Sequence, residues 1–134
     1  MTTTEMNLAK RLGFAPGQTV AEIGWDDDCD DELRGSVEEV TGTELLDEEA
    51  EEAVDVVLLW WRDDEGDLAD DLMDAASRLK DGGYIWLVTP KMGRNGYVDP
   101  GDVHEGAQAA GLTQGTSLVA AQDWIGTKLA RPSR

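Results

Sequence analysis

The densest group of side chains that could bind a cation is the run Asp26-Asp27-Asp28-Cys29-Asp30-Asp31-Glu32. Its first, third and fifth positions carry aspartates, as an EF-hand calcium loop begins. That loop needs glycine at position six and glutamate at position twelve, whereas Asp31 and Val37 stand there. We therefore exclude an EF-hand. We expect these carboxylates to begin a helix, whose dipole favours them, with a weak surface site for Mg²⁺ or Ca²⁺ as the alternative.

Nucleophilic and zinc chemistry have few residues to use. The chain has one histidine, His104, in a weakly apolar segment without a catalytic motif, so we expect an exposed polar residue. A lone cysteine excludes an intramolecular disulfide and an all-cysteine metal cage. The carboxylates around Cys29 should raise its pKa and keep the thiol unreactive. We predict no catalytic residue and no metal ligand.

Aromatic and cationic residues gather near the ends of predicted strands. Open α/β sheets bind ligands at the carboxyl ends of their strands. Within this group we expect Trp25 to pack where a ligand would otherwise lie, and Trp61 and Arg62 to form a contact surface. The predicted ligand or partner surface comprises Trp25, Asp26, Trp60, Trp61, Arg62, Thr89, Lys91 and Arg94.

Hydrophobic periodicity predicts the elements that position these residues. Strands are expected over 19–23, 54–61, 84–88, 112–121 and 124–130. Helices are expected from Thr4, in the acidic run, from Gly66, and from Asp99 or Asp102. Strands that alternate with helices imply a parallel sheet, and the short link between the last two strands requires an antiparallel hairpin. We predict one α/β domain over residues 1–134.

The negative charge is concentrated in one part of the chain. The net charge is −18, and 23 of the 29 acidic residues lie between Glu22 and Asp74. Such a surface repels nucleic acid and anionic membranes, so we expect no direct binding to either. It favours a basic protein partner or a cation, and the alternative is that the charge serves solubility alone.

Three stretches, in order, resemble the class I S-adenosylmethionine-dependent methyltransferase fold. Residues 12–24 resemble its first strand and the start of its cofactor loop. Residues 54–59 and 79–90 resemble its fourth and fifth strands, and residues 109–112 resemble the turn before its final hairpin. The resemblance implies a shortened Rossmann-like, mostly parallel sheet flanked by helices, with a C-terminal antiparallel hairpin.

The departures from that family bear on activity. Its first strand is followed by G-x-G-x-G, whose glycines let the backbone approach the cofactor. Here the loop is Gly24-Trp25-Asp26-Asp27-Asp28, which keeps only the first glycine. Bulk and negative charge thus stand where the resemblance places the methionyl carboxylate of the cofactor. The short segment from Gly24 to Val54 leaves little room for two outer strands and for the acidic residue that holds the ribose.

The whole chain also resembles a family of short acidic actinobacterial proteins of unknown function. Residues 4–9, 22–26, 58–62 and 123–124 carry that match. The resemblance implies no particular activity.

We therefore predict a non-catalytic regulatory or protein-interaction module without a cofactor. Loss of the outer strands would leave the 19–23 strand at or near an edge, and exposed edges pair with other chains unless they are covered. We expect a homodimer or a protein complex through that edge or the acidic helix. The alternatives are a residual S-adenosylmethionine or small-ligand binding protein or methyltransferase, and an acidic nucleic-acid mimic that binds a basic protein. No apolar run could cross a bilayer and no secretory signal is visible at the start, so we expect a cytoplasmic location.

Overall fold

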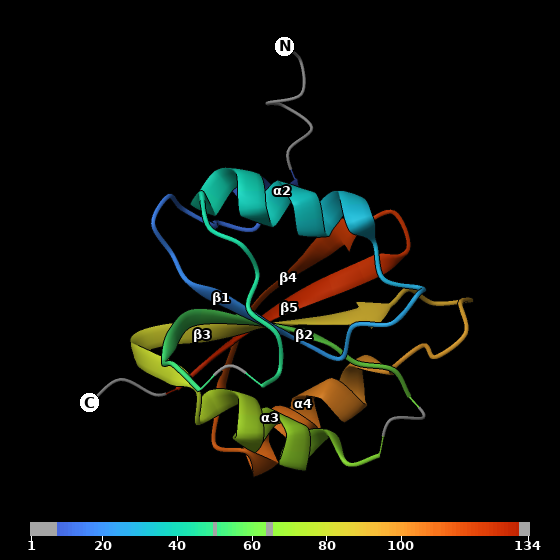
Figure 1. Cartoon of the computed structure of the whole chain (residues 1–134). Coiled ribbons are helices and arrows are strands. Elements are labelled where there is room, and N and C mark those ends of the chain that lie inside the picture. The colour runs from blue at the N-terminus through green and yellow to red at the C-terminus, as the bar shows by residue number, and fades with distance from the viewer. Residues whose placement is uncertain (1–7, 50, 64–65, 132–134) are drawn as a thin grey trace.

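A computed structural model describes residues 8–49, 51–63 and 66–131 (Figure 1). Thr4, which we expected to cap the first helix, lies outside these residues. The helices are α1 (Leu8–Arg11), α2 (Asp31–Thr41), α3 (Leu68–Ala76) and α4 (Pro100–Ala109). The strands are β1 (Val20–Ile23), β2 (Val54–Trp60), β3 (Leu79–Pro90), β4 (Thr113–Ala121) and β5 (Trp124–Ala130).

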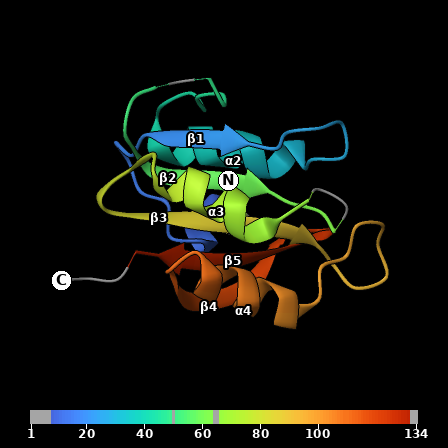
Figure 2. The same cartoon turned by 90° about the horizontal axis from the view of Figure 1, so that it is seen from below.

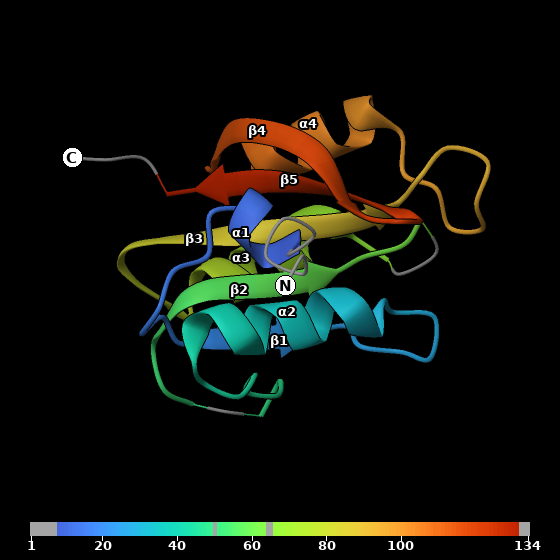
Figure 3. The same ribbon diagram turned by 90° about the horizontal axis from the view of Figure 1, so that it is seen from above.

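The strands form one sheet in the order β1-β2-β3-β5-β4. β1, β2 and β3 are parallel, and β5 is antiparallel to both β3 and β4. The helices α1 and α2 cover one face of the sheet, and α3 and α4 cover the other (Figures 1 and 3). The predicted α/β class, with a mostly parallel sheet and a C-terminal antiparallel hairpin, is confirmed.

The central strand β2 is buried on both faces, as its continuous apolar sequence indicates. Val57 and Leu59 pack toward α3 and α4, whereas Leu58 and Trp60 join the core on the opposite face. Because successive side chains of a strand point to opposite faces, this one strand holds both layers together.

The acidic run begins a helix, as expected. Asp30 is the N-cap of α2, and its carboxylate accepts a hydrogen bond of 2.9 Å from the backbone N–H of Leu33. The helix ends at Gly42, whose φ of 78° places it in the left-handed region that favours glycine. Local capping chemistry therefore accounts for both ends of α2.

The third strand is longer than expected. β3 begins at Leu79, which pairs with Val54, so Lys80-Asp81-Gly82-Gly83 lies within the strand and does not form a separate turn. A register shift in the β2–β3 pairing accommodates the additional residues. At Gly83 a Cβ atom would lie 2.7 Å from the carbonyl oxygen of Asp55, so the two backbones approach too closely for a side chain.

The outer edge of β1 is not open. Leu46 forms a parallel bridge with Ala21, since its N–H donates to the Val20 carbonyl and its carbonyl accepts from the Glu22 N–H. β1 is the edge strand of the sheet, as expected, but Leu46 covers the centre of its outer edge. A bridge of one residue occupies the position next to β1 where a further strand would lie.

Candidate functional site

The loop from Gly24 to Cys29 follows β1 at the carboxyl end of the sheet, where the cofactor loop was expected. Gly24 has a φ of 84°, and a Cβ atom on it would lie 2.3 Å from the carbonyl oxygen of Trp60. Glycine is required here because the backbone of β2 passes so close. The one retained glycine thus has a packing role against β2.

A buried arginine fastens this loop to the end of β2. Arg62 is 8% exposed, and its Nε donates to Asp28 Oδ2 at 3.0 Å while Nη2 donates to Asp28 Oδ1. Its Nη1 donates to the Gly24 carbonyl at 3.0 Å. The guanidinium lies 5.4 Å from the centre of the Trp124 ring. Hydrogen bonds from Arg62 lower the pKa of the Asp28 carboxyl, so the pair stays charged.

A second network holds Trp25 at the surface. Glu22 is 7% exposed and accepts hydrogen bonds from Arg34 Nε at 2.6 Å and from Trp60 Nε1 at 2.9 Å. The bond to Glu22 raises the pKa of Arg34. The Arg34 guanidinium in turn lies 5.6 Å from the centre of the Trp25 ring. Half of Trp25 is exposed, whereas we expected it to pack where a ligand would otherwise lie.

Cys29, the cysteine of this loop, is buried and has a raised pKa. Burial raises the pKa of the Cys29 thiol to about 11, and nearby Asp28 adds a smaller upward effect. The predicted direction is confirmed, although desolvation contributes more than the carboxylates do. Cys29 Sγ accepts a hydrogen bond of 3.3 Å from the Asp26 N–H and contacts Arg62 Nη2 at 3.4 Å.

The predicted rim is divided among several environments. Trp60 is fully buried and meets Trp124 edge to face, with ring centres 4.9 Å apart. Trp61 and Arg62, expected on a contact surface, are 5% and 8% exposed. Arg62 turns inward to Asp28, and Trp61 Nε1 donates to Asp71 Oδ2 at 2.9 Å. Trp25 and Asp26 are exposed in the loop itself.

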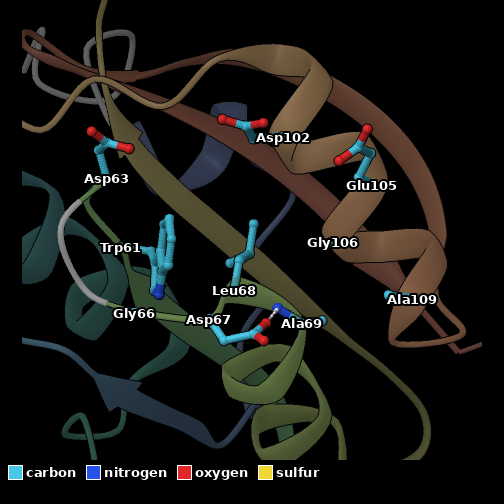
Figure 4. A pocket seen from close by; sticks show the side chains of 10 residues that line it. All are labelled: Trp61, Asp63, Gly66, Asp67, Leu68, Ala69, Asp102, Glu105, Gly106 and Ala109. Atoms are coloured by element: carbon cyan, nitrogen blue, oxygen red, sulfur yellow. Dashed lines mark hydrogen bonds between the residues drawn. The ribbon is translucent and has the colours of Figure 1, made fainter.

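Trp61 nevertheless lines a pocket of about 590 Å³ between α3 and α4 (Figure 4). The pocket is also lined by carboxylates from three segments of the chain: Asp63, Asp67, Asp102 and Glu105. Asp67 also caps α3, accepting from the Ala69 N–H at 3.0 Å. Sequence reasoning missed this pocket because Asp67 and Asp102 have the appearance of ordinary helix-start residues. Among the described residues, no group of three or more His, Cys, Asp or Glu side chains is placed to hold a metal ion.

The remaining predicted residues lie in two other pockets. Thr89 and Lys91 line one of about 520 Å³ beside α4. Arg94 lines one of about 390 Å³ with Asp28 and Trp124, and it forms an ion pair of 3.5 Å with Asp123. His104 Nδ1 lies 3.2 Å from Gln114 Oε1 at an exposed position. None of the helices in the described ranges is long and apolar enough to span a bilayer.

Comparison with known proteins agrees with this architecture. The chain is 49% identical over 126 residues to the uncharacterized protein Rv2239c of Mycobacterium tuberculosis, covering 94% of this chain and 79% of that protein. Its fold is similar to that of PhzM, a pyocyanin biosynthetic protein, with a TM-score of 0.72 and 10% identity. That match covers 94% of this chain but only 54% of PhzM, so the chain spans about half of that protein.

A second solved structure shows the same likeness. Magnesium protoporphyrin IX methyltransferase from Synechocystis PCC 6803, solved with bound S-adenosylmethionine, matches with a TM-score of 0.57 and 12% identity. The match covers 98% of this chain and 79% of that one. At such identities the likeness concerns the fold, which is methyltransferase-like. The model of the family described as "protein of unknown function (DUF3052)" matches residues 9–133, and the chain therefore belongs to that family.

Proposed function

We propose that this protein is a non-catalytic interaction module that binds a basic partner protein through Trp25 and the carboxylates around it. The proposal has two parts. The loop that holds the cofactor in methyltransferases is here bound by the chain's own side chains, and the same loop displays an indole to solvent.

The first part rests on the groups that face the loop. The Gly24 N–H donates to Glu48 Oε2 at 2.9 Å, and the Gly24 carbonyl accepts from Arg62. Asp28 binds the same guanidinium. A cofactor carboxylate would meet two carboxylates, Glu48 and Asp28, and would have to displace both sets of bonds. Like charges repel, so Glu48 and Asp28 would oppose the carboxylate of the cofactor. These residues therefore do not fit S-adenosylmethionine.

The observation that carries the second part is the support beneath Trp25. The exposed indole lies over Arg34, which is anchored by Glu22 and, through it, by the buried Trp60. A tryptophan is the residue type most enriched at energetic centres of interfaces. Because Arg34 already holds the Trp25 side chain in place, little of this chain would have to become ordered when a partner binds. The entropic cost of association is therefore lower.

The surrounding charge indicates the chemistry of the partner. Asp26, Asp27, Asp31 and Glu32 are exposed beside Trp25 on the loop and on the first turn of α2. A basic surface would complement these carboxylates, speed encounter and exclude acidic proteins. An association of this kind weakens as salt is added.

Reconstitution with purified components tests the proposal. The immobilised chain would first be used to capture binding proteins from extracts of the native host. Each captured protein would then be produced separately and titrated against wild type, Trp25→Ala and Met92→Ala. Met92 is an exposed apolar residue on another loop and serves as the matched control. We expect Trp25→Ala to weaken a salt-sensitive complex at least tenfold and Met92→Ala to leave it unchanged.

Two results would refute this function. One is a partner that binds Trp25→Ala as tightly as wild type, which would place the interface elsewhere. The other is self-association of the purified chain in sedimentation experiments that Trp25→Ala abolishes, which would make the surface a homodimer interface. Competition of the partner complex by DNA would identify the basic partner as a nucleic-acid-binding protein and the chain as its acidic mimic.

A further inference from the structure

The pocket of about 520 Å³ lies beneath α4 and differs in chemistry from the rest of this acidic chain. Its floor is the sheet face of β3, β5 and β4, and Figure 2 shows α4 lying across β4 and β5. Among the described residues that line it, none is Asp or Glu. The pocket in Figure 4, by contrast, is lined by four carboxylates. A volume of this size is within the range of small-molecule sites.

On the sheet face that forms the floor of this pocket, side chains with hydroxyl groups follow the aliphatic side chains of the core. Ile85, Leu87 and Leu129 belong to the core that packs under α3 and α4. Further along the same face stand Thr89 and Thr127, each 4% exposed and both lining the pocket. Thr127 Oγ1 lies 3.0 Å from Ser117 Oγ, so one of the two donates to the other. The hydroxyl hydrogen of the acceptor remains available to a ligand.

Lys91 adds a positive charge at the end of β3. It lines the same pocket and is half-buried. Within the described part of the chain, no carboxylate lies within the 4.0 Å of an ion pair with its ammonium. Lys80, at the opposite end of β3, does have such a partner, Asp55 at 3.8 Å.

The other walls are mostly apolar, with Tyr97 and Gln114 as the exceptions. Val98 and Val103 are buried, and Ile125 and the flexible Met92 complete the apolar side. The N-terminus of α4 offers no further anion site, because the Asp99 carboxylate already accepts from the Gly101 N–H at 2.9 Å. The Lys91 ammonium and the hydroxyl groups of Thr89, Ser117 and Thr127 thus form the polar end of a pocket whose other walls are mostly hydrophobic.

We infer that this pocket binds a small carboxylic acid with an apolar body. The carboxylate would accept hydrogen bonds from the Lys91 ammonium and from the hydroxyl groups of Thr89 and of the Ser117–Thr127 pair. The apolar body would pack against Val98, Val103 and Ile125. A single positive charge matches a monoanion better than a phosphate dianion. The inference is independent of the proposed partner surface, which lies at the β1–α2 loop.

Titration of the ¹⁵N-labelled chain with octanoic acid at neutral pH, followed by amide chemical shifts, tests this inference. 1-Octanol has the same apolar body without the charge and serves as the matched ligand. We expect saturable shifts in residues 89–92, 97–103 and 114–127, and binding of octanoate at least tenfold tighter than that of octanol. Lys91→Met should remove this preference, whereas Lys80→Met should preserve it. Thr127→Val, which removes a hydroxyl with little change in shape, should weaken octanoate binding several-fold.

Two outcomes would overturn the inference. One is the absence of shifts in these segments at millimolar octanoate. The other is equal binding of octanoate and octanol that Lys91→Met does not alter, which would leave an apolar cavity without carboxylate recognition. The amide spectrum of each variant would establish that it is folded, and the comparison of the two ligands on wild type needs no variant at all.

Discussion

Arg62 and Asp28 face each other across the carboxyl end of the sheet and share two hydrogen bonds, although 34 positions separate them in the chain. Arg62 is the second residue after β2, and Asp28 lies in the loop after β1. The third donor of the guanidinium binds the Gly24 carbonyl. One side chain therefore fastens the loop at both ends, in the region where a methyltransferase keeps open backbone for its cofactor.

Substitution of Arg62 by methionine should destabilise the protein. Asp28 and the Gly24 carbonyl would lose their donors, and we expect a loss of about 1–3 kcal/mol in the free energy of unfolding, measured in urea. Arg94→Met is the matched control, because Arg94 is 58% exposed and its ion pair with Asp123 is long. Exposed pairs contribute about 0–1 kcal/mol. Equal unfolding midpoints for the two variants would contradict a structural role of the Arg62–Asp28 pair.

The same pair should make stability depend on pH. The pKa of Asp28 is lowered in the folded state by hydrogen bonds from Arg62, so its contribution is present above the unfolded value, about 3.9. It is lost as the pH falls through the lowered folded value. We therefore expect wild type to exceed Asp28→Asn in stability near neutral pH and the difference to shrink in acid. A difference that is constant from neutral pH to pH 2 would contradict this.

Gly24 should tolerate alanine poorly. At Gly111, which has a φ of 77° and open space for a Cβ, alanine pays only the backbone cost of about 1–2 kcal/mol. At Gly24 the added Cβ also meets the Trp60 carbonyl at 2.3 Å. We expect Gly24→Ala to lower the thermal midpoint clearly more than Gly111→Ala. Similar midpoints would mean that the loop and β2 separate easily, contrary to the close packing described above.

Cys29 should react slowly with alkylating reagents. Its pKa of about 11 leaves little thiolate at pH 8, and the side chain is buried. Iodoacetamide labelling followed by mass spectrometry should be much slower in the folded protein than in urea. Rapid labelling of the folded protein would show that the loop opens readily.

Local patterns were sufficient to predict most of the fold. The apolar run of β2 indicates a strand covered on both faces, and Asp30 and Gly42 define the ends of α2 through capping chemistry. The final hairpin follows from its short turn. The Leu46 bridge escaped prediction because one paired residue leaves no periodic signal. β3 was predicted too short because glycines usually end strands, whereas Gly83 is needed where Asp55 comes close.

The candidate site was less predictable, because its contacts join distant segments. The sequence contains five tryptophans but does not say which of them fills the region behind the loop. Trp60 occupies it together with Arg62, so Trp25 is displaced to the surface over Arg34. An arginine that follows an apolar strand resembles an exposed end residue. Its burial depends on Asp28, whose proximity only the tertiary structure reveals.

Calorimetric titration of the wild-type chain with S-adenosylmethionine is the most direct test of the closed loop, with the amide signals of residues 24–29 recorded in parallel. We expect no saturable heat and no shift of those signals, because Arg62 and Glu48 already hold the Gly24 backbone. Micromolar binding, accompanied by shifts in those residues, would show that the loop opens to admit the cofactor and would contradict the proposal of a non-catalytic module.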